Sequence, residues 1–141
     1  NFHDVVYLVR KRGEFMEAAA AKNPGKMSCI LGLDVKLVRE ICQETGCEIA
    51  NLNCPGQVVV SGRLQNLEAL SKVATERGAK RVIPLDVSGA FHSTLMHPAA
   101  LRFQDVVGSV AIIPSAIDVI SNVNALPHKD AEKIRWGGLS D

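Results

Sequence analysis

The sequence predicts an α/β protein with a compact β-α-β-β-α-β module at the centre of the chain. Three observations lead to this prediction. Apolar residues make up 47% of the 141 residues and charged residues 22%, as in one ordinary globular domain. Strand and helix periodicities alternate between residues 27 and 87. The segments before and after this module contain a helical pattern and apolar runs that have no place in the β-α-β-β-α-β order and indicate further α/β structure.

A long helix is predicted over residues 3–21. Its apolar face repeats at spacings of three and four, and the helix ends before Asn23-Pro24-Gly25. The predicted inner stripe consists of Val5, Val6, Val9, Arg12 and Met16.

The first half of the central module reads as a strand, a helix and a strand. Residues 27–31 form a short apolar run, Asp34 can cap a helix, and Gly46 ends that helix. Residues 48–52 form the next strand. The helix is expected to turn inward the side chains of Leu37, Val38, Ile41 and Cys42.

The second half repeats this plan after the turn residues 53–56. A valine-rich strand covers 57–61, a helix ends at Gly78, and a last strand covers 81–85. The inner face of this helix is predicted to carry Leu64, Leu67, Leu70 and Ala74. The resulting order is the ferredoxin-like arrangement.

The rest of the chain is predicted to belong to a larger α/β domain that this module interrupts. A loop with small residues and two histidines covers 88–97, and Pro98 suits the first turn of a helix that runs to about Val107. Residues 117–123 read as a buried strand of a parallel sheet, and 127–135 as a loop and a short helix. We therefore divide the chain into 1–25, 26–87 and 88–141. Most of the sheet that residues 1–25 and 88–141 would pack against is missing from the sequence, so we expect the apolar faces of these segments to be exposed to solvent.

Composition excludes several classes of function. The formal net charge of +1 does not predict nucleic-acid binding, and no apolar run is long enough to span a membrane. The four cysteines form no Cys-x-x-Cys pair and have no histidine cluster nearby, so no metal site is expected. They read as reduced thiols of a cytosolic protein.

Two side chains are candidates for chemistry. His92 lies in the loop after the last strand of the module, among small residues, where an imidazole can act as a general base; a structural histidine is the alternative. Arg12 lies on an apolar stripe, where its charge needs a carboxylate partner; the alternative is a guanidinium at the edge of the stripe with its stem buried.

A nucleophile is harder to find. The sequence has no Gly-x-Ser-x-Gly elbow, and Ser61, Ser88 and Ser93 do not stand between a strand and a helix. Cys54, in a turn, is the best cysteine candidate, but a small turn residue is expected there in any case.

Five stretches together resemble the malonyl-CoA:acyl carrier protein transacylase family, in order and spacing, from about Phe2 to Arg135. They are Leu8-Val9-x-x-Arg12-Gly13-x-x-Met16, Met27-Ser28-Cys29-Ile30-Leu31-Gly32-Leu33-Asp34, the run from Asn51 to Gly62, the run from Gly78 to Ala99 around Gly89-Ala90-Phe91-His92-Ser93, and Ser121-Asn122-Val123-x-Ala125. The resemblance implies a ferredoxin-like subdomain inserted in an α/β hydrolase-like acyltransferase domain, here incomplete.

The resemblance also implies a reaction and a site. A serine in a Gly-His-Ser-x-Gly elbow would attack malonyl-CoA, His92 would activate it, and the phosphopantetheine thiol of acyl carrier protein would accept the malonyl group. Arg12 would pair with the free malonyl carboxylate. Phe91 would crowd a methyl branch on the acyl group. The remaining pocket positions match Met16, Met27, Val87 and Ser88. No cofactor is implied, and the location would be the bacterial cytoplasm or an organelle.

The sequence departs from the family pattern at both ends. The elbow serine is expected upstream of Asn1. After Arg135 the family continues with a glutamine and a Pro-Val-x-Trp segment, whereas here Trp136-Gly137-Gly138 follows. We therefore expect the 141-residue chain to be inactive alone. Two alternatives remain open: a non-catalytic module that binds acyl carrier protein or a synthase, and the acyltransferase segment of a multidomain polyketide or fatty acid synthase.

Overall fold

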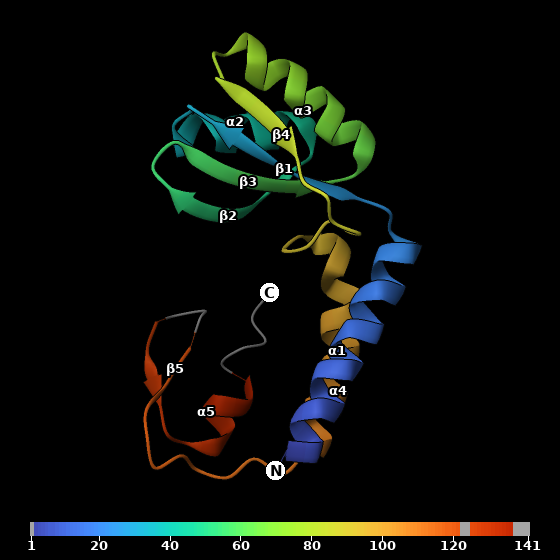
Figure 1. The fold of residues 1–141 in the computed structure, drawn as a ribbon, viewed down its shortest axis with the longest axis vertical. Coiled ribbons are helices and arrows are strands. Elements are labelled where there is room, and N and C mark those ends of the chain that lie inside the picture. Colours follow the sequence, from blue (N-terminus) through green and yellow to red (C-terminus); the bar gives the residue numbers. More distant parts are fainter. Residues whose placement is uncertain (1, 122–124, 137–141) are drawn as a thin grey trace. The chain divides into compact units, whose positions relative to one another are not determined.

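The structure is a computed structural model that describes residues 2–121 and 125–136 (Figure 1). The chain forms two compact units. One comprises Met16–His97, and the other comprises Asn1–Phe15 with Pro98–Asp141. The first unit contains the whole central module and also the loop that carries His92.

A four-stranded antiparallel sheet forms the centre of the unit Met16–His97. The strands lie in the order β2-β3-β1-β4. Their bounds are β1 (Lys26–Leu31), β2 (Glu48–Cys54), β3 (Gln57–Gly62) and β4 (Arg81–Pro84). Helices α2 (Val35–Thr45) and α3 (Leu64–Glu76) cover one face of this sheet (Figure 1). Every predicted strand and helix of the module is thus confirmed to within about two residues.

Local signals account for the ends of α2. The carboxylate of Asp34 accepts a hydrogen bond from the Lys36 amide at 2.8 Å, as an N-cap does. Gly46 follows the helix with φ +68°, a left-handed conformation that glycine adopts without steric cost. The main core lies between these helices and the sheet, and its fully buried side chains include Ile30, Ile41 and Leu70.

The predicted inner face of α3 is correct at three positions and wrong at the fourth. Leu67, Leu70 and Ala74 are buried, whereas Leu64 is 58% exposed. Leu64 is the first residue of α3, and the helix meets the core only one turn later, at Leu67. Helical spacing identifies a face but not where along the helix burial begins.

The second face of the sheet carries a smaller apolar cluster. Met27, Cys29 and Val59 are buried there, and Phe91 from the loop after β4 packs against them. This loop contains a short 3-10 helix, η1 (Thr94–Met96). The His92 loop is therefore attached to the sheet face that α2 and α3 do not cover.

The other unit contains most of α1 (Phe2–Lys22), α4 (His97–Ser109) from Pro98 onward, β5 (Val119–Ile120), β6 (Pro127–His128) and α5 (Ala131–Trp136). The guanidinium of Arg102 lies 4.3 Å from the ring centre of Phe15, so α4 and α1 are in contact. Arg135 of α5 donates hydrogen bonds to the carbonyl oxygens of Val107 and Val110. The helices predicted over 3–21 and from Pro98 to about Val107 are confirmed.

The buried parallel strand predicted over 117–123 is wrong. Only Val119 and Ile120 are paired, they pair antiparallel to β6, and both are exposed. A parallel strand needs neighbouring strands and helices on both faces, and among the described residues β5 has β6 alone as a partner. Residues 122 and 123 lie outside the described residues, as does the tail from residue 137.

The predicted inner stripe of α1 is also largely exposed, as expected for the outer parts of the chain. Val5, Val6 and Val9 all keep about half or more of their surface in solvent. None of the described helices combines the length and the apolar character that crossing a bilayer requires.

Candidate active site

The His92 loop leaves the sheet along the first residues of β1. The Leu85 amide donates to the Met27 carbonyl at 2.9 Å, and the Lys26 ammonium donates to the Val87 carbonyl at 2.7 Å. The chain then turns back over the second face of the sheet. Met27, Val87 and Phe91, three of the predicted pocket residues, come together there in one apolar cluster.

Glycine allows the loop to approach this closely. A Cβ atom on Gly25 would lie 2.7 Å from the Cβ of Ala90 and 2.7 Å from the carbonyl oxygen of Gly62. Ala90 itself is completely buried. Because nothing larger than hydrogen fits between these atoms, Gly25 fixes how near the loop lies to the end of the sheet.

Side chains of the sheet and of the loop bind the backbone on both sides of His92. Ser61 donates a hydrogen bond to the carbonyl oxygen of Phe91, and Ser93 donates to that of Ala90 at 2.6 Å. The Glu48 carboxylate accepts from the Thr94 amide at 3.1 Å and from the Thr94 hydroxyl at 2.7 Å. Side-chain hydrogen bonds therefore hold the backbone at residues 90, 91 and 94.

His92 itself has an unusual backbone and an accessible side chain. Its φ of +56° is left-handed, which costs a residue other than glycine about 1–2 kcal/mol. The side chain is exposed, and within the described part of the chain its imidazole has no hydrogen-bond partner. Left-handed residues held by their surroundings cluster at functional sites, and an accessible imidazole is a common general acid or base in catalysis.

The other predicted site residues have different surroundings. Ser88 is exposed, and Met16 is half-buried on α1. Arg12 lies in the other compact unit and is exposed, and no described carboxylate pairs with it. Its neighbours differ, because Lys11 and Arg10 both bind Glu14, at 2.8 and 2.7 Å, and hold the pKa of that carboxyl below its ordinary value. Among the described residues of this basic run, Arg12 is thus the one whose side chain is not paired with Glu14.

None of the described residues is an activated nucleophile. The Ser61 hydroxyl is buried and bound to Phe91, and the Ser93 hydroxyl is bound to Ala90. Cys54 is exposed but contacts only the side-chain oxygen of Gln57, at 3.5 Å, which cannot take its proton. Burial raises the pKa of the Cys42 thiol to about 12, which leaves that thiol protonated and unreactive at neutral pH.

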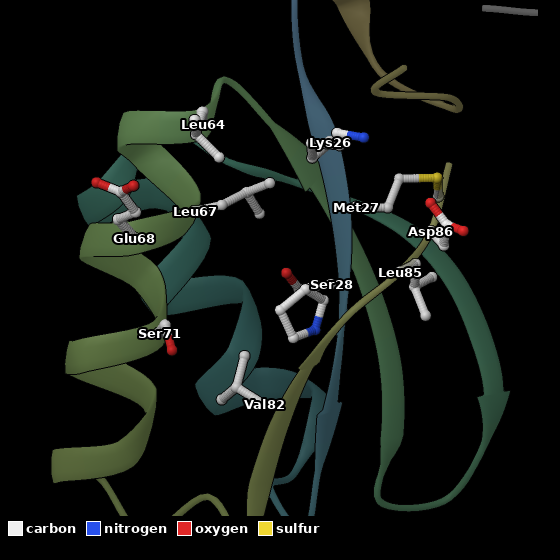
Figure 2. Close-up of a pocket in the computed structure, with 11 residues that line it drawn as sticks. Lys26, Met27, Ser28, Leu64, Leu67, Glu68, Ser71, Val82, Leu85 and Asp86 are labelled. Carbon is white, nitrogen blue, oxygen red and sulfur yellow. The ribbon is translucent and has the colours of Figure 1, made fainter. Parts of the chain in front are cut away.

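A shallow pocket lies at the edge of the sheet, between α3 and the start of β1 (Figure 2). Its lining includes Leu67 of α3 on one side of β1 and Met27 and Leu85 on the other side of that strand (Figure 2). Met27 is the one predicted site residue in its lining. Across the described ranges, no group of three metal-binding side chains gathers anywhere.

Sequence reasoning missed the residues that hold the loop, namely Gly25, Lys26, Glu48 and Ser61. One signal was present: Ser61 is a polar residue at the end of an otherwise apolar strand. Its partner, the carbonyl of Phe91, lies 30 residues away in sequence, and Glu48 lies 46 residues from Thr94. Periodicity contains no information about such distant pairs.

Comparison with known proteins extends these observations. No protein-family model matches the sequence. Over 130 residues, 89% of this chain, the sequence is 47% identical to a malonyl CoA-acyl carrier protein transacylase of Bacillus subtilis, of which it covers 41%. A Staphylococcus aureus protein of the same name is 41% identical over 140 residues, 46% of its length. The chain therefore spans about half the length of the curated relatives it matches.

Solved structures give the same result. The malonyl CoA-acyl carrier protein transacylase from Coxiella burnetii matches with a TM-score of 0.88 and 33% identity, over 97% of this chain and 45% of that one. A malonyl-transacylase in complex with a type II polyketide synthase acyl-carrier protein matches with a TM-score of 0.90 and 33% identity, over 97% of this chain and 46% of that one. The chain is therefore an α/β protein similar to malonyl CoA-acyl carrier protein transacylases over about half of their length.

Proposed function

We propose that this sequence forms the histidine-bearing part of an enzyme that transfers malonyl from malonyl-CoA to acyl carrier protein in fatty acid synthesis. The observation that carries the proposal is an exposed, left-handed His92 on a tightly bound loop, in a chain 47% identical to a named malonyl transacylase. The matching structure of a malonyl-transacylase bound to an acyl-carrier protein supports the second substrate. We place the enzyme in the bacterial cytoplasm or an organelle.

In this reaction His92 transfers protons. It takes the proton of a serine hydroxyl as the serine oxygen attacks the malonyl thioester, and it returns that proton to the coenzyme A thiol when the C–S bond breaks. In the second half it takes the proton of the phosphopantetheine thiol as the sulfur attacks the malonyl-serine ester, and it returns that proton to the serine oxygen when the C–O bond breaks. As the family resemblance implies, the serine would come from a part of the enzyme that this sequence does not span.

Arg12 is proposed to bind the free malonyl carboxylate. Guanidinium groups bind carboxylates through two parallel hydrogen bonds, and Arg12 has no carboxylate partner among the described residues. The cluster of Met27, Val87 and Phe91, together with Met16 and Ser88, would line the acyl pocket. Phe91 would then disfavour a methyl-branched acyl group by about 1–3 kcal/mol.

For the fold, we propose a ferredoxin-like subdomain, residues 26–87, inserted in an α/β hydrolase-like acyltransferase domain to which residues 1–25 and 88–141 belong. The β2-β3-β1-β4 strand order supports the first part. The bare apolar surface of α1 and β5 supports the second, because such surface normally packs against further sheet.

The main alternative is a module that binds acyl carrier protein without catalysis, or that binds another part of a synthase. The specific observation in its favour is that the described residues include no activated nucleophile. A third hypothesis is that the sequence is the acyltransferase segment of a multidomain synthase. The reaction would then be the same, and only the protein to which the segment belongs would differ.

A chimera tests the proposal. The matching segment of the Bacillus subtilis relative is replaced by this sequence, and malonyl transfer to acyl carrier protein is assayed. We expect activity that His92→Ala lowers by at least about 10²-fold, the usual contribution of a general base. His97→Ala, which removes an exposed histidine five residues away, is the matched control. Equal rates for the two variants would remove His92 from the mechanism, and carrier-protein binding by an inactive chimera would favour the binding module.

A further inference from the structure

We propose that Glu48 and Ser61 are positioning residues for His92, which set the direction of its imidazole by fixing the backbone on both sides of it. This proposal rests on the proposed function, because positioning matters only if His92 transfers protons. It concerns two residues outside the histidine loop, on two strands of the sheet.

The register of the sheet places these residues together. Glu48 of β2 lies directly opposite Ser61 of β3, and Ser61 lies directly opposite Met27 of β1. Opposite residues of antiparallel strands point to the same face of the sheet. The three side chains therefore form a row across the end of the face on which Phe91 packs.

Ser61 controls the peptide bond that precedes His92. Its side chain is completely buried, and its hydroxyl donates to the carbonyl oxygen of Phe91. That carbonyl and the amide nitrogen of His92 belong to one planar peptide group. Holding the oxygen therefore fixes the plane from which the His92 side chain projects.

Glu48 controls the chain that follows His92. Its carboxylate accepts hydrogen bonds from both the amide and the hydroxyl of Thr94, two residues after the histidine. Hydrogen bonds to a charged acceptor are stronger than neutral ones. With both sides of the histidine fixed, the left-handed φ of +56° is maintained although histidine disfavours it.

The first test measures catalysis in the Bacillus subtilis chimera. We expect Glu48→Ala to lower kcat about 10- to 100-fold while KM for malonyl-CoA stays within about twofold, because a displacement of about 1 Å costs rate without removing substrate contacts. Glu48→Gln, which keeps one acceptor oxygen, should recover part of the rate. Glu44→Ala, which removes a surface carboxylate paired with Arg77, is the matched control and should behave as the unmodified chimera.

Three further variants keep the test decisive if Glu48→Ala fails to fold. Ser61→Ala should lower kcat in the same way, and Thr94→Val should do so while Thr94→Ser does not. In the 141-residue chain, amide hydrogen exchange at Thr94 should become at least about tenfold faster in Glu48→Ala and stay unchanged in Glu44→Ala. This last measurement involves no catalysis.

The outcomes separate the two proposals. If His92→Ala abolishes transfer but Glu48→Ala, Ser61→Ala and Thr94→Val all match the Glu44→Ala control in kcat, the positioning role is wrong and the proposed function stands. If His92→Ala leaves transfer intact, His92 has no part in the proposed mechanism and the positioning role is wrong with it. A change in KM alone, with kcat preserved, would also overturn the positioning role, because it would indicate substrate contact instead.

Discussion

The two compact units differ in how fully they bury their apolar residues. In Met16–His97 the sheet and two helices enclose a core in which Ile30, Ile41 and Leu70 have almost no exposed surface. In the other unit, Val9, Ile117 and Ile120 are mostly exposed. A βαββαβ segment therefore contains nearly all the partners that its apolar faces need, whereas the flanking helix and strand need partners that the described residues do not supply.

The largest effect should come from a pair of leucines that differ in burial. Leu70 of α3 is completely buried, and Leu101 of α4 is 50% exposed. We expect Leu70→Ala to lower the free energy of unfolding by about 2–5 kcal/mol, through lost burial and the cavity left behind. Leu101→Ala should change it by about 0.5 kcal/mol or less. Urea unfolding followed by circular dichroism measures both, and equal effects would contradict the contrast between the units.

A pair of glycines sharpens the same contrast. A Cβ on Gly25 meets Ala90 and the Gly62 carbonyl at 2.7 Å, whereas a Cβ on Gly13 in α1 meets nothing within 4 Å. Gly25→Ala should destabilise the chain by about 1–3 kcal/mol and displace the His92 loop. Gly13→Ala should stabilise it by about 0.5–1 kcal/mol, because alanine favours the helix. Thermal unfolding measures both variants, and we expect changes in stability of opposite sign: a loss for Gly25→Ala and a gain for Gly13→Ala.

The pH dependence of the core follows from Cys42. Burial raises the pKa of its thiol from 9.0 to about 12. The unfolded chain therefore loses this proton at lower pH than the folded chain, so the stability contributed by the protonated thiol is complete below about pH 9 and is lost as pH rises toward 12. Cys42→Val should flatten the fall in unfolding free energy across this window. An unchanged fall would show that other groups cause it.

The smallest effect on stability is expected for Cys54→Ser, which should change the reactivity of the thiols and leave the free energy of unfolding nearly unchanged. Cys54 is exposed, whereas Cys29, Cys42 and Cys47 are buried. In the native chain one thiol should react quickly with a colorimetric disulfide reagent, and Cys54→Ser should remove that fast phase. Rapid reaction of three or four thiols would mean that the core opens readily.

The sequence predicted the central module well because its signals are local. Asp34 and Gly46 mark the ends of α2, and the spacing of Leu67, Leu70 and Ala74 identifies the inner face of α3. Predictions failed where burial depends on distant partners. The apolar run at 117–123 is typical of a core strand, but among the described residues only Val119 and Ile120 pair, with β6 alone, and both are exposed.

The candidate site divides in the same way. The exposed His92 lies in the predicted loop, and Met27, Val87 and Phe91 share one apolar cluster. The roles of these residues and of Arg12 stay predictions. Glu48 and Ser61 could not be predicted, because their hydrogen bonds to the loop join segments that only the strand register brings together.

We propose that His92 acts in catalysis together with a nucleophilic serine from a part of the enzyme that this sequence does not span. Intact-mass spectrometry after incubation with malonyl-CoA tests it most directly, on the 141-residue chain and on the Bacillus subtilis chimera side by side. We predict one added malonyl group on the chimera, lost or greatly slowed in His92→Ala, and no addition to the 141-residue chain. A malonyl group bound covalently to the 141-residue chain would contradict the account.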